Sequence, residues 1–205
     1  MLRSERRKPL TPRDLQAATP AATGARLRRI YARLRGHFGP AGWWPAKTSF
    51  EVCVGAILVQ NTAWTNAAKA LAALRRRRLL HFAALRRLPP SRLAPLIRSS
   101  RYYRVKARRL QAFLRFLEAR YGGRSEAMRA EEPWALRAAL LEVPGIGRET
   151  ADSIVLYAAG QPLFVVDAYT RRVFARLGLL CGDESYDFIQ RFFMERLPPQ
   201  AELYN

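Results

Sequence analysis

The segment LLEVPGIGRETADSIVLYAAGQPLFVVDAYTRR, residues 140–172, contains three features whose order predicts the local fold. A glycine hairpin at 143–147 opens directly into an apolar helical pattern over 148–159. Asp167 then follows a break made by a glycine and a proline. This order predicts a helix, a tight hairpin, a second helix, and an acidic side chain placed shortly after the second helix.

The hairpin has the chemistry of a phosphate-binding turn. Its two glycines let the backbone turn tightly and approach another surface without a Cβ in the way. The N–H groups that begin the following helix have no internal partner and carry the positive end of the helix dipole. We therefore expect a DNA strand to contact Gly145, Ile146, Gly147, Arg148 and Thr150. A plain turn between two helices is the alternative interpretation.

The charge of the chain favours a polyanionic partner. Its 205 residues include 36 Lys and Arg against 16 Asp and Glu, which gives a formal net charge of +20. The sequence pI is near 11.3. An excess of this size indicates nucleic acid first and an anionic lipid surface second.

Other sequence features indicate a cytoplasmic protein. No apolar run approaches the ~18 residues of a membrane span, and residues 1–20 lack the apolar centre of a signal peptide. Cys53 and Cys181 are isolated and fit no metal-ligand spacing, so we expect reduced thiols and no metal site.

The hydrophobic pattern predicts an all-α fold. Apolar positions recur at helical spacing from residue 25 onward, and no segment shows sustained period-2 alternation. Residues 1–24 are basic and contain proline, and we interpret them as a flexible lead-in to a domain over 25–205.

The motifs resemble the helix-hairpin-helix glycosylases of the endonuclease III superfamily. The resemblance lies in Leu-x-x-Val-Pro-Gly-Ile-Gly-Arg, a helix, Gly-x-Pro and Val-Val-Asp, together with GAILVQNT at 55–62 and SRYYRVKA at 100–107. It covers residues 25–205. It implies a base-excision-repair DNA glycosylase that hydrolyses the N-glycosidic bond of a damaged base in double-stranded DNA. A monomer acting at a bacterial-type nucleoid is expected.

The resemblance also implies an architecture. One helical lobe is expected from about residue 46 to 160, and a second from 25–45 together with 161–205. DNA would lie in the cleft between the lobes, and the damaged nucleotide would rotate out of the duplex because its glycosidic bond is hard to reach inside the stack.

Asp167 is the predicted catalytic residue. Cleavage of an N-glycosidic bond develops oxocarbenium character on the sugar, and a nearby carboxylate stabilises that charge and can orient water. The position of Asp167 before the helical run 168–177 also suits an N-cap. The two roles are compatible.

Glu149 departs from the pattern of the bifunctional relatives. In those proteins a Lys stands second after the last hairpin glycine, and its amine forms a Schiff base that permits strand cleavage. Glu149 cannot attack as an amine, and Arg148 stays protonated. The sequence therefore predicts a monofunctional enzyme, similar to the Lys-less 3-methyladenine glycosylase branch, which also has the Glu-x-Ala-Asp run of 149–152. A first-turn acid favoured by the helix dipole is the structural alternative for Glu149.

Two further groups of residues are candidates for contacts with DNA. Gln60 and Asn61 stand where relatives place the loop that fills the gap left by a flipped nucleotide, although a plain helix break is an equal alternative. An extruded base could stack on aromatic side chains, and core packing is the alternative for each of them. Glu149 is a further candidate for the base pocket. The candidate base-pocket aromatics are Trp43, Trp44, Trp64 and Tyr169.

The cysteine content excludes one cofactor of many relatives. Those proteins continue beyond a Leu-Tyr-Asn-like segment into a further helix and a four-Cys iron–sulfur loop. This chain has two cysteines and stops at Asn205, so no cofactor is expected, and a missing terminal helix is left open.

Two alternative functions remain from the sequence. A non-catalytic helix-hairpin-helix DNA-binding protein would account for the charge and the hairpin and would leave Asp167 unexplained. A bifunctional glycosylase and lyase would need another amine, and the candidates are Lys47, Lys69 and Lys106.

Overall fold

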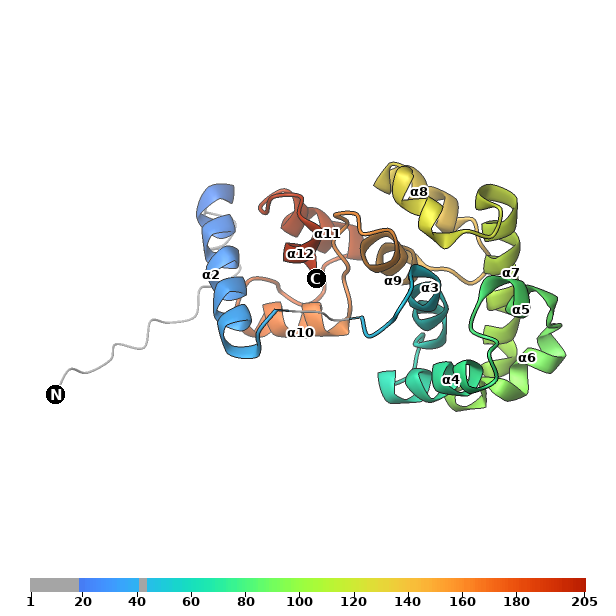
Figure 1. Cartoon of the computed structure of the whole chain (residues 1–205). Coiled ribbons are helices and arrows are strands. Elements are labelled where there is room, and N and C mark those ends of the chain that lie inside the picture. The colour runs from blue at the N-terminus through green and yellow to red at the C-terminus, as the bar shows by residue number, and fades with distance from the viewer. Residues whose placement is uncertain (1–18, 41–43) are drawn as a thin grey trace. The chain divides into compact units, whose positions relative to one another are not determined.

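The computed structural model describes residues 19–40 and 44–205 and is helical throughout its regular elements (Figure 1). No strand occurs among these described residues, so the predicted all-α fold is confirmed. None of the described helices is long and apolar enough to cross a membrane. Two compact units divide the chain. Unit 1 comprises residues 1–41 and 164–203, and unit 2 comprises 42–163 with 204–205. The sequence had placed the corresponding boundaries at 45/46 and 160/161.

Unit 2 carries most of the helices. In chain order its elements are α3 (Ser49–Leu58), α4 (Trp64–Arg76), α5 (Phe82–Arg87), α6 (Pro90–Leu96), η1 (Arg98–Ser100), α7 (Tyr103–Tyr121), η2 (Ser125–Ala130), α8 (Pro133–Leu141), α9 (Arg148–Ser153) and η3 (Ile154–Ala158).

Helix α3 is the centre of unit 2. Thr48 caps it by accepting a hydrogen bond from the Glu51 backbone N–H, and nine of its ten residues are buried. A helix that is apolar on every side must be surrounded by other elements. Helices α4, α7 and α9 and the segment η3 all pack against it. The loop that follows α3 is thereby fixed between α7 and the start of α9.

The second hairpin helix is not a continuous α-helix. After Ser153 the chain forms a π-helical turn over Ile154–Ala158, in which the Ala159 N–H donates to the Ile154 carbonyl at 3.0 Å. A π turn inserts one residue into the helical repeat and turns the following side chains to a different face. Tyr157 lies in this turn.

Unit 1 consists of α2 (Pro20–Phe38), α10 (Ala168–Arg176), α11 (Tyr186–Met194) and all but the last residue of the short α12 (Ala201–Tyr204). The lead-in predicted to reach residue 24 is wrong at its end, because α2 begins at Pro20. Thr19 accepts a hydrogen bond from Ala22 N–H, and proline suits the first helical position. Gly24 is buried, and a Cβ there would lie 2.4 Å from the Arg196 carbonyl oxygen. Residues 1–18 lie outside the described part of the chain.

The segment that leads into α10 is extended and held by α11. Gln190 donates from its buried amide to the Phe164 carbonyl at 2.7 Å, and Val166 N–H donates to the Tyr186 hydroxyl at 3.3 Å. The Phe164 ring stacks on Phe193 with 4.2 Å between centroids. These contacts fix the backbone that presents Asp167 within unit 1.

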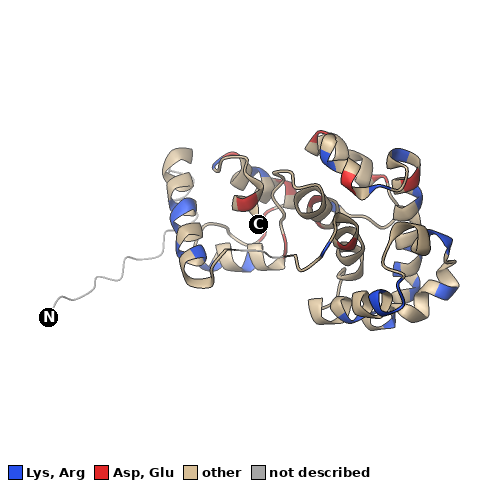
Figure 2. Cartoon of the chain, in the orientation of Figure 1, with Lys and Arg blue, Asp and Glu red and all other residues tan. Residues whose placement is uncertain are grey.

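Basic side chains are spread over both units (Figure 2). Blue positions recur along α4 and α7 and also on two helices of unit 1, while acidic positions are fewer and scattered. The excess charge seen in the sequence is therefore carried largely by solvated helix surfaces, where it attracts a polyanion over a Debye length of about 10 Å.

Candidate active site

The hairpin joins α8 to α9 as predicted and is anchored by its apolar residues. Val143 and Ile146 are each 5% exposed, and Ile146 N–H donates to the Val143 carbonyl at 3.0 Å. Gly145 has φ +90°, a conformation that L side chains rarely adopt. A Cβ at Gly145 would lie only 2.4 Å from Arg109 Cγ, so the packing as well as the turn requires glycine there.

Gly147 has a different role from Gly145. Its φ of −95° is open to any residue, and a Cβ there would meet no atom within 4 Å. It is the N-cap residue of α9 and makes no side-chain cap hydrogen bond. Nothing inside the described chain requires glycine at this position, so the open space beside Gly147 is available to an external backbone or phosphate.

A groove of about 510 Å³ brings most of the predicted DNA-contact residues together. Its walls come from the α3–α4 loop, from α7 and from the hairpin with the first turn of α9. The lining residues include Gln60, Asn61, Arg109, Gly145, Ile146, Gly147, Arg148, Glu149 and Thr150. Of these, Arg109 was not singled out from the sequence.

Gln60 is folded onto the hairpin. Its amide Nε2 donates to the Gly145 carbonyl at 3.0 Å and to Thr150 Oγ1 at 2.9 Å. Its Oε1 accepts from Arg109 Nη1 at 2.6 Å. Asn61 follows in a left-handed conformation with φ +51°, which asparagine tolerates, and it is exposed. The loop that follows α3 is therefore hydrogen-bonded to the hairpin through the Gln60 side chain.

The Glu-x-Ala-Asp run divides into one exposed and one buried acid. Glu149 is exposed and lines the groove. Asp152 is fully buried, and its Oδ1 lies 2.6 Å from Arg137 Nε of α8. Arg137 and Asp152 thus hold together the two helices on either side of the hairpin, which gives Asp152 a structural role.

An aromatic cluster forms part of unit 2. The rings of Trp44 and Trp64 pack edge to face at 5.5 Å, and Trp44 lies 5.2 Å from Tyr157. All three side chains are half-buried. Gly55 makes room for Trp44, because a Cβ at Gly55 would lie 3.1 Å from the indole Nε1.

The sequence interpretation missed Tyr157 because the π turn changes the face to which it points, and a regular helical repeat places it elsewhere. Trp43 lies outside the described residues. Tyr169 belongs to unit 1, where it is 67% exposed and stacks under the Arg172 guanidinium at 4.8 Å.

Asp167 is the N-cap of α10. Its Oδ1 accepts from the Thr170 backbone N–H at 2.7 Å and from the Thr170 hydroxyl at 2.9 Å. The side chain is half-buried. Both of these bonds are to one carboxylate oxygen, so the cap holds the carboxylate in a defined pose at the positive end of a helix.

Lys106 of α7 is 1% exposed. Its Nζ donates to the Leu58 carbonyl at 2.8 Å and also to the Ser100 carbonyl. Burial, and then the charge of Arg109, lower the pKa of Lys106 to about 8. An amine so enclosed cannot reach a sugar without unfolding its surroundings, whereas Lys47 and Lys69 are exposed.

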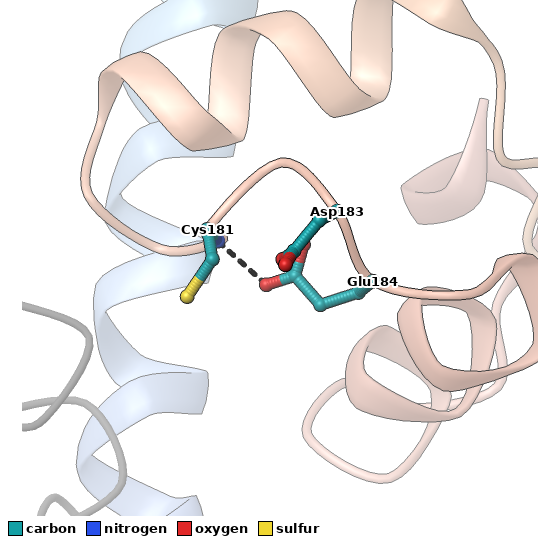
Figure 3. Close-up of side chains that lie close together, drawn as sticks. All are labelled: Cys181, Asp183 and Glu184. Carbon is teal, nitrogen blue, oxygen red and sulfur yellow. Dashed lines mark hydrogen bonds between the residues drawn. The ribbon is translucent and has the colours of Figure 1, made fainter.

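The loop after α10 contains the one cluster of potential metal ligands found among the described residues (Figure 3). It consists of Cys181, Asp183 and Glu184. Glu184 already accepts hydrogen bonds from the backbone N–H groups of Cys181 and Gly182, so its carboxylate caps this loop. Burial raises the pKa of the Cys53 thiol.

The comparison with protein families places the chain. A family model for HhH-GPD superfamily base excision DNA repair proteins matches residues 54–199, which include the second half of α3, the hairpin and Asp167. The chain belongs to this superfamily. The predicted function as a DNA glycosylase of the endonuclease III superfamily is therefore confirmed at this level, and DNA is its partner.

Relatives and solved structures agree with this assignment. The chain is 42% identical over 179 residues to the Methanocaldococcus jannaschii protein MJ1434, provisionally named a DNA repair glycosylase, and the match covers 87% of this chain and 81% of that protein. It is 31% identical over 113 residues to endonuclease III of Bacillus subtilis, covering 55% of this chain and 48% of that protein.

Among solved structures, the Helicobacter pylori 3-methyladenine DNA glycosylase bound to 1,N6-ethenoadenine aligns with a TM-score of 0.74 and 28% identity. That alignment covers 91% of this chain and 92% of the other. A covalent endonuclease III–DNA intermediate aligns with a TM-score of 0.73 and 25% identity over 88% of this chain and 80% of the other.

Proposed function

We propose that this HhH-GPD protein is a monofunctional glycosylase of the Lys-less 3-methyladenine branch, which removes a damaged base from double-stranded DNA by hydrolysis and leaves an abasic site. The observation that carries the proposal is Glu149, which occupies the position where the bifunctional relatives have their Schiff-base lysine and lies on the wall of the hairpin groove. A carboxylate there cannot form an imine with the sugar.

The burial of Lys106 supports the same conclusion. Of the three lysines that could replace the missing amine, Lys106 is enclosed and bonded to two backbone carbonyls. Lys47 and Lys69 remain as the exposed candidates for a bifunctional enzyme. Substituting Lys47 and Lys69 one at a time therefore tests directly whether either amine gives the protein lyase activity.

The proposed reaction assigns each group one task. The hairpin, with Gly147 and the first turn of α9, binds a phosphate of the damaged strand. Once the nucleotide is extruded, its C1′–N bond breaks as positive charge develops on the sugar, and the Asp167 carboxylate stabilises that charge. Water supplies the new C1′–O bond. Its proton is transferred to a base that leaves as an anion, or is released to solvent when a cationic alkylated purine leaves as a neutral molecule, so the products are a free base and an abasic sugar. These steps use water and a carboxylate and require no cofactor.

The aromatic cluster suggests the class of base. An alkylated purine is electron-deficient and gains from stacking on indole and phenol rings through cation–π attraction. Trp44, Trp64 and Tyr157 provide such rings in unit 2. The H. pylori relative, a 3-methyladenine glycosylase with ethenoadenine bound, is consistent with this class. We propose that the protein acts as a monomer on nucleoid DNA.

A panel of lesion-bearing duplexes tests the proposal. Each duplex is incubated with the protein and then divided, with one half treated with alkali to cut abasic sites. Strand cleavage only after alkali, with an alkylated purine as the responsive lesion, is the expected result. Nicking without alkali, or a covalent adduct trapped by borohydride, would show a lyase. Tight duplex binding with no base release from any lesion would favour the non-catalytic DNA-binding alternative.

A further inference from the structure

We propose that Arg109 is a positioning residue that holds the Gln60 side chain on the hairpin in the free protein and releases it when a DNA phosphate arrives. The inference rests on the proposed function, in which the loop at Gln60 fills the gap left by the flipped nucleotide. Arg109 lies outside the sequence motifs, and its bond to Gln60 implies that DNA contact at the hairpin groove precedes release of the Gln60 side chain.

The Gln60 amide is engaged at both ends. Its oxygen accepts from Arg109 Nη1 at 2.6 Å, and its nitrogen donates to the Gly145 carbonyl at 3.0 Å and to Thr150 Oγ1 at 2.9 Å. A side-chain amide has two N–H donors, and both are used here. Gln60 therefore cannot donate to a base edge until these bonds open.

Arg109 lies where it can respond to a phosphate. Its stem covers Gly145 so closely that a Cβ at Gly145 would be 2.4 Å from Cγ and 2.6 Å from Nε. The guanidinium lines the same groove as Gly147 and Arg148, and it is half-buried. A phosphate oxygen is anionic and accepts a stronger hydrogen bond from a guanidinium than an amide oxygen does. A phosphate bound at the hairpin therefore draws Arg109 away from Gln60.

This arrangement sets the order of two steps. Contact with the strand comes first, because the phosphate is needed to weaken the Arg109–Gln60 bond. Gap filling follows, because only then is the Gln60 amide free to move. In the absence of DNA the Gln60 side chain is held against the hairpin.

The test uses a DNA probe that does not depend on the identity of the lesion. A duplex carries a tetrahydrofuran abasic analogue with 2-aminopurine opposite, and stopped-flow fluorescence follows insertion into the gap. The measured quantity is the rate of the phase that does not depend on protein concentration. Arg109→Met retains the stem over Gly145 and removes the bond to Gln60. Loss of one charge-assisted hydrogen bond is expected to accelerate this phase by about tenfold.

Three further variants distinguish positioning from charge or folding effects. Arg109→Lys restores a cation at the same position and is expected to return the rate to within about threefold of the wild type. Thr150→Val removes the opposite anchor of the amide without changing charge, and is expected to accelerate the phase by about threefold. Arg108→Met, the matched control, removes an exposed positive charge from the same helix and should leave this rate unchanged. A slower or unchanged rate in both Arg109→Met and Thr150→Val would overturn the inference.

A double-mutant cycle gives an independent measurement. The affinity for the abasic duplex is compared for the wild type, Arg109→Met, Gln60→Ala and the double variant. If Arg109 restrains Gln60, then Arg109→Met costs about tenfold less affinity when Gln60 is present than when it is Ala. Equal losses in the two backgrounds would mean that Arg109 contacts DNA independently, and would refute the inference while leaving the proposed glycosylase intact. No binding of the abasic duplex by the wild type would refute the inference, whereas the proposed glycosylase is tested separately by base release from the lesion-bearing duplexes.

Discussion

Arg137 Nε lies 2.6 Å from Asp152 Oδ1, and this ion pair joins the helix before the hairpin to the helix after it. The Asp152 side chain is completely buried, and that of Arg137 is 13% exposed. A pair in this setting contributes less through its own attraction than through the cost of leaving either charge alone. It therefore locks the α8–α9 geometry that shapes the hairpin.

Substitution of Asp152 is expected to destabilise the protein strongly. Asp152→Ala leaves the Arg137 guanidinium buried without this carboxylate, and the free energy of unfolding should fall by about 3–5 kcal/mol in urea denaturation. Glu118→Ala is the control, since Glu118 pairs with Arg86 at a site where both side chains are well exposed. That control should cost less than about 1 kcal/mol. Similar losses in the two variants would contradict the structural role of Asp152.

Replacement of the Asp167 carboxylate is expected to separate catalysis from binding. Asp167→Asn keeps a side-chain oxygen that can cap α10 by accepting from Thr170 N–H, so the stability should change little. The neutral amide cannot balance the developing sugar charge, and single-turnover base release should fall by at least about 100-fold. DNA affinity, followed by fluorescence anisotropy, should remain within a few-fold. Near-normal base release would remove Asp167 from the mechanism.

Substitution of the two hairpin glycines by alanine is expected to affect the free energy of unfolding by different amounts. Gly145→Ala meets both a positive φ and a contact of 2.4 Å with Arg109, so it should lower the free energy of unfolding by about 1–3 kcal/mol. Gly147→Ala has open space around it and should change stability by less than about 0.5 kcal/mol.

DNA binding distinguishes a second role for Gly147. If a DNA backbone occupies the space beside Gly147, the added methyl group should weaken duplex affinity by about tenfold, the equivalent of one or two lost hydrogen bonds. Wild-type affinity for Gly147→Ala would show that no strand approaches this residue. The stability measurement on the same variant ensures that the loss does not come from unfolding.

Lys106 is expected to make stability depend on pH in the alkaline range. Its pKa falls to about 8 in the folded protein from a usual value of 10.5, because burial penalises the charged amine. Between these two values the unfolded chain binds more protons than the folded one, so stability rises as the pH increases from 8 to 10.5. The neutral amine still has N–H groups to donate to Leu58 and Ser100.

The size of this effect is measured against a variant that cannot titrate. The difference in unfolding free energy between the wild type and Lys106→Met should grow in favour of the wild type by about 3 kcal/mol between pH 7.5 and 10.5, using 1.36 kcal/mol per pKa unit. A difference that stays constant with pH would show that Lys106 keeps an ordinary pKa. Other alkaline groups are present in both proteins and cancel.

Sequence patterns were sufficient for the elements that follow local rules. The helix over 168–177, the Asp167 cap and the helix–hairpin–helix order were predicted because spacing, caps and glycines act within a few residues of each other. The start of α2 was predicted too late. Its cap at Thr19 is local, with Ala22 N–H donating to the Thr19 hydroxyl, but the close approach of Gly24 to the Arg196 carbonyl joins segments that are distant in sequence.

The grouping of the candidate site depended on distant contacts. Gln60, Arg109 and Gly145 come from three parts of the chain, and only the packing of α3 against α7 and α9 brings them to one groove. Tyr157 joins Trp44 because a π turn shifts the helical repeat, and no periodicity in a single sequence reports such a shift.

The amino-acid sequence by itself determined the helical elements, the hairpin, the basic charge and the absence of a lysine at Glu149, because each is a property of neighbouring residues or of composition. Only the tertiary structure decided which of these residues are engaged with one another. Lys106 and Asp152 are buried, Gly145 and Gly147 differ in the space around them, and the Gln60 amide is bonded to Arg109. Burial and hydrogen bonds between segments distant in sequence arise only when the helices pack.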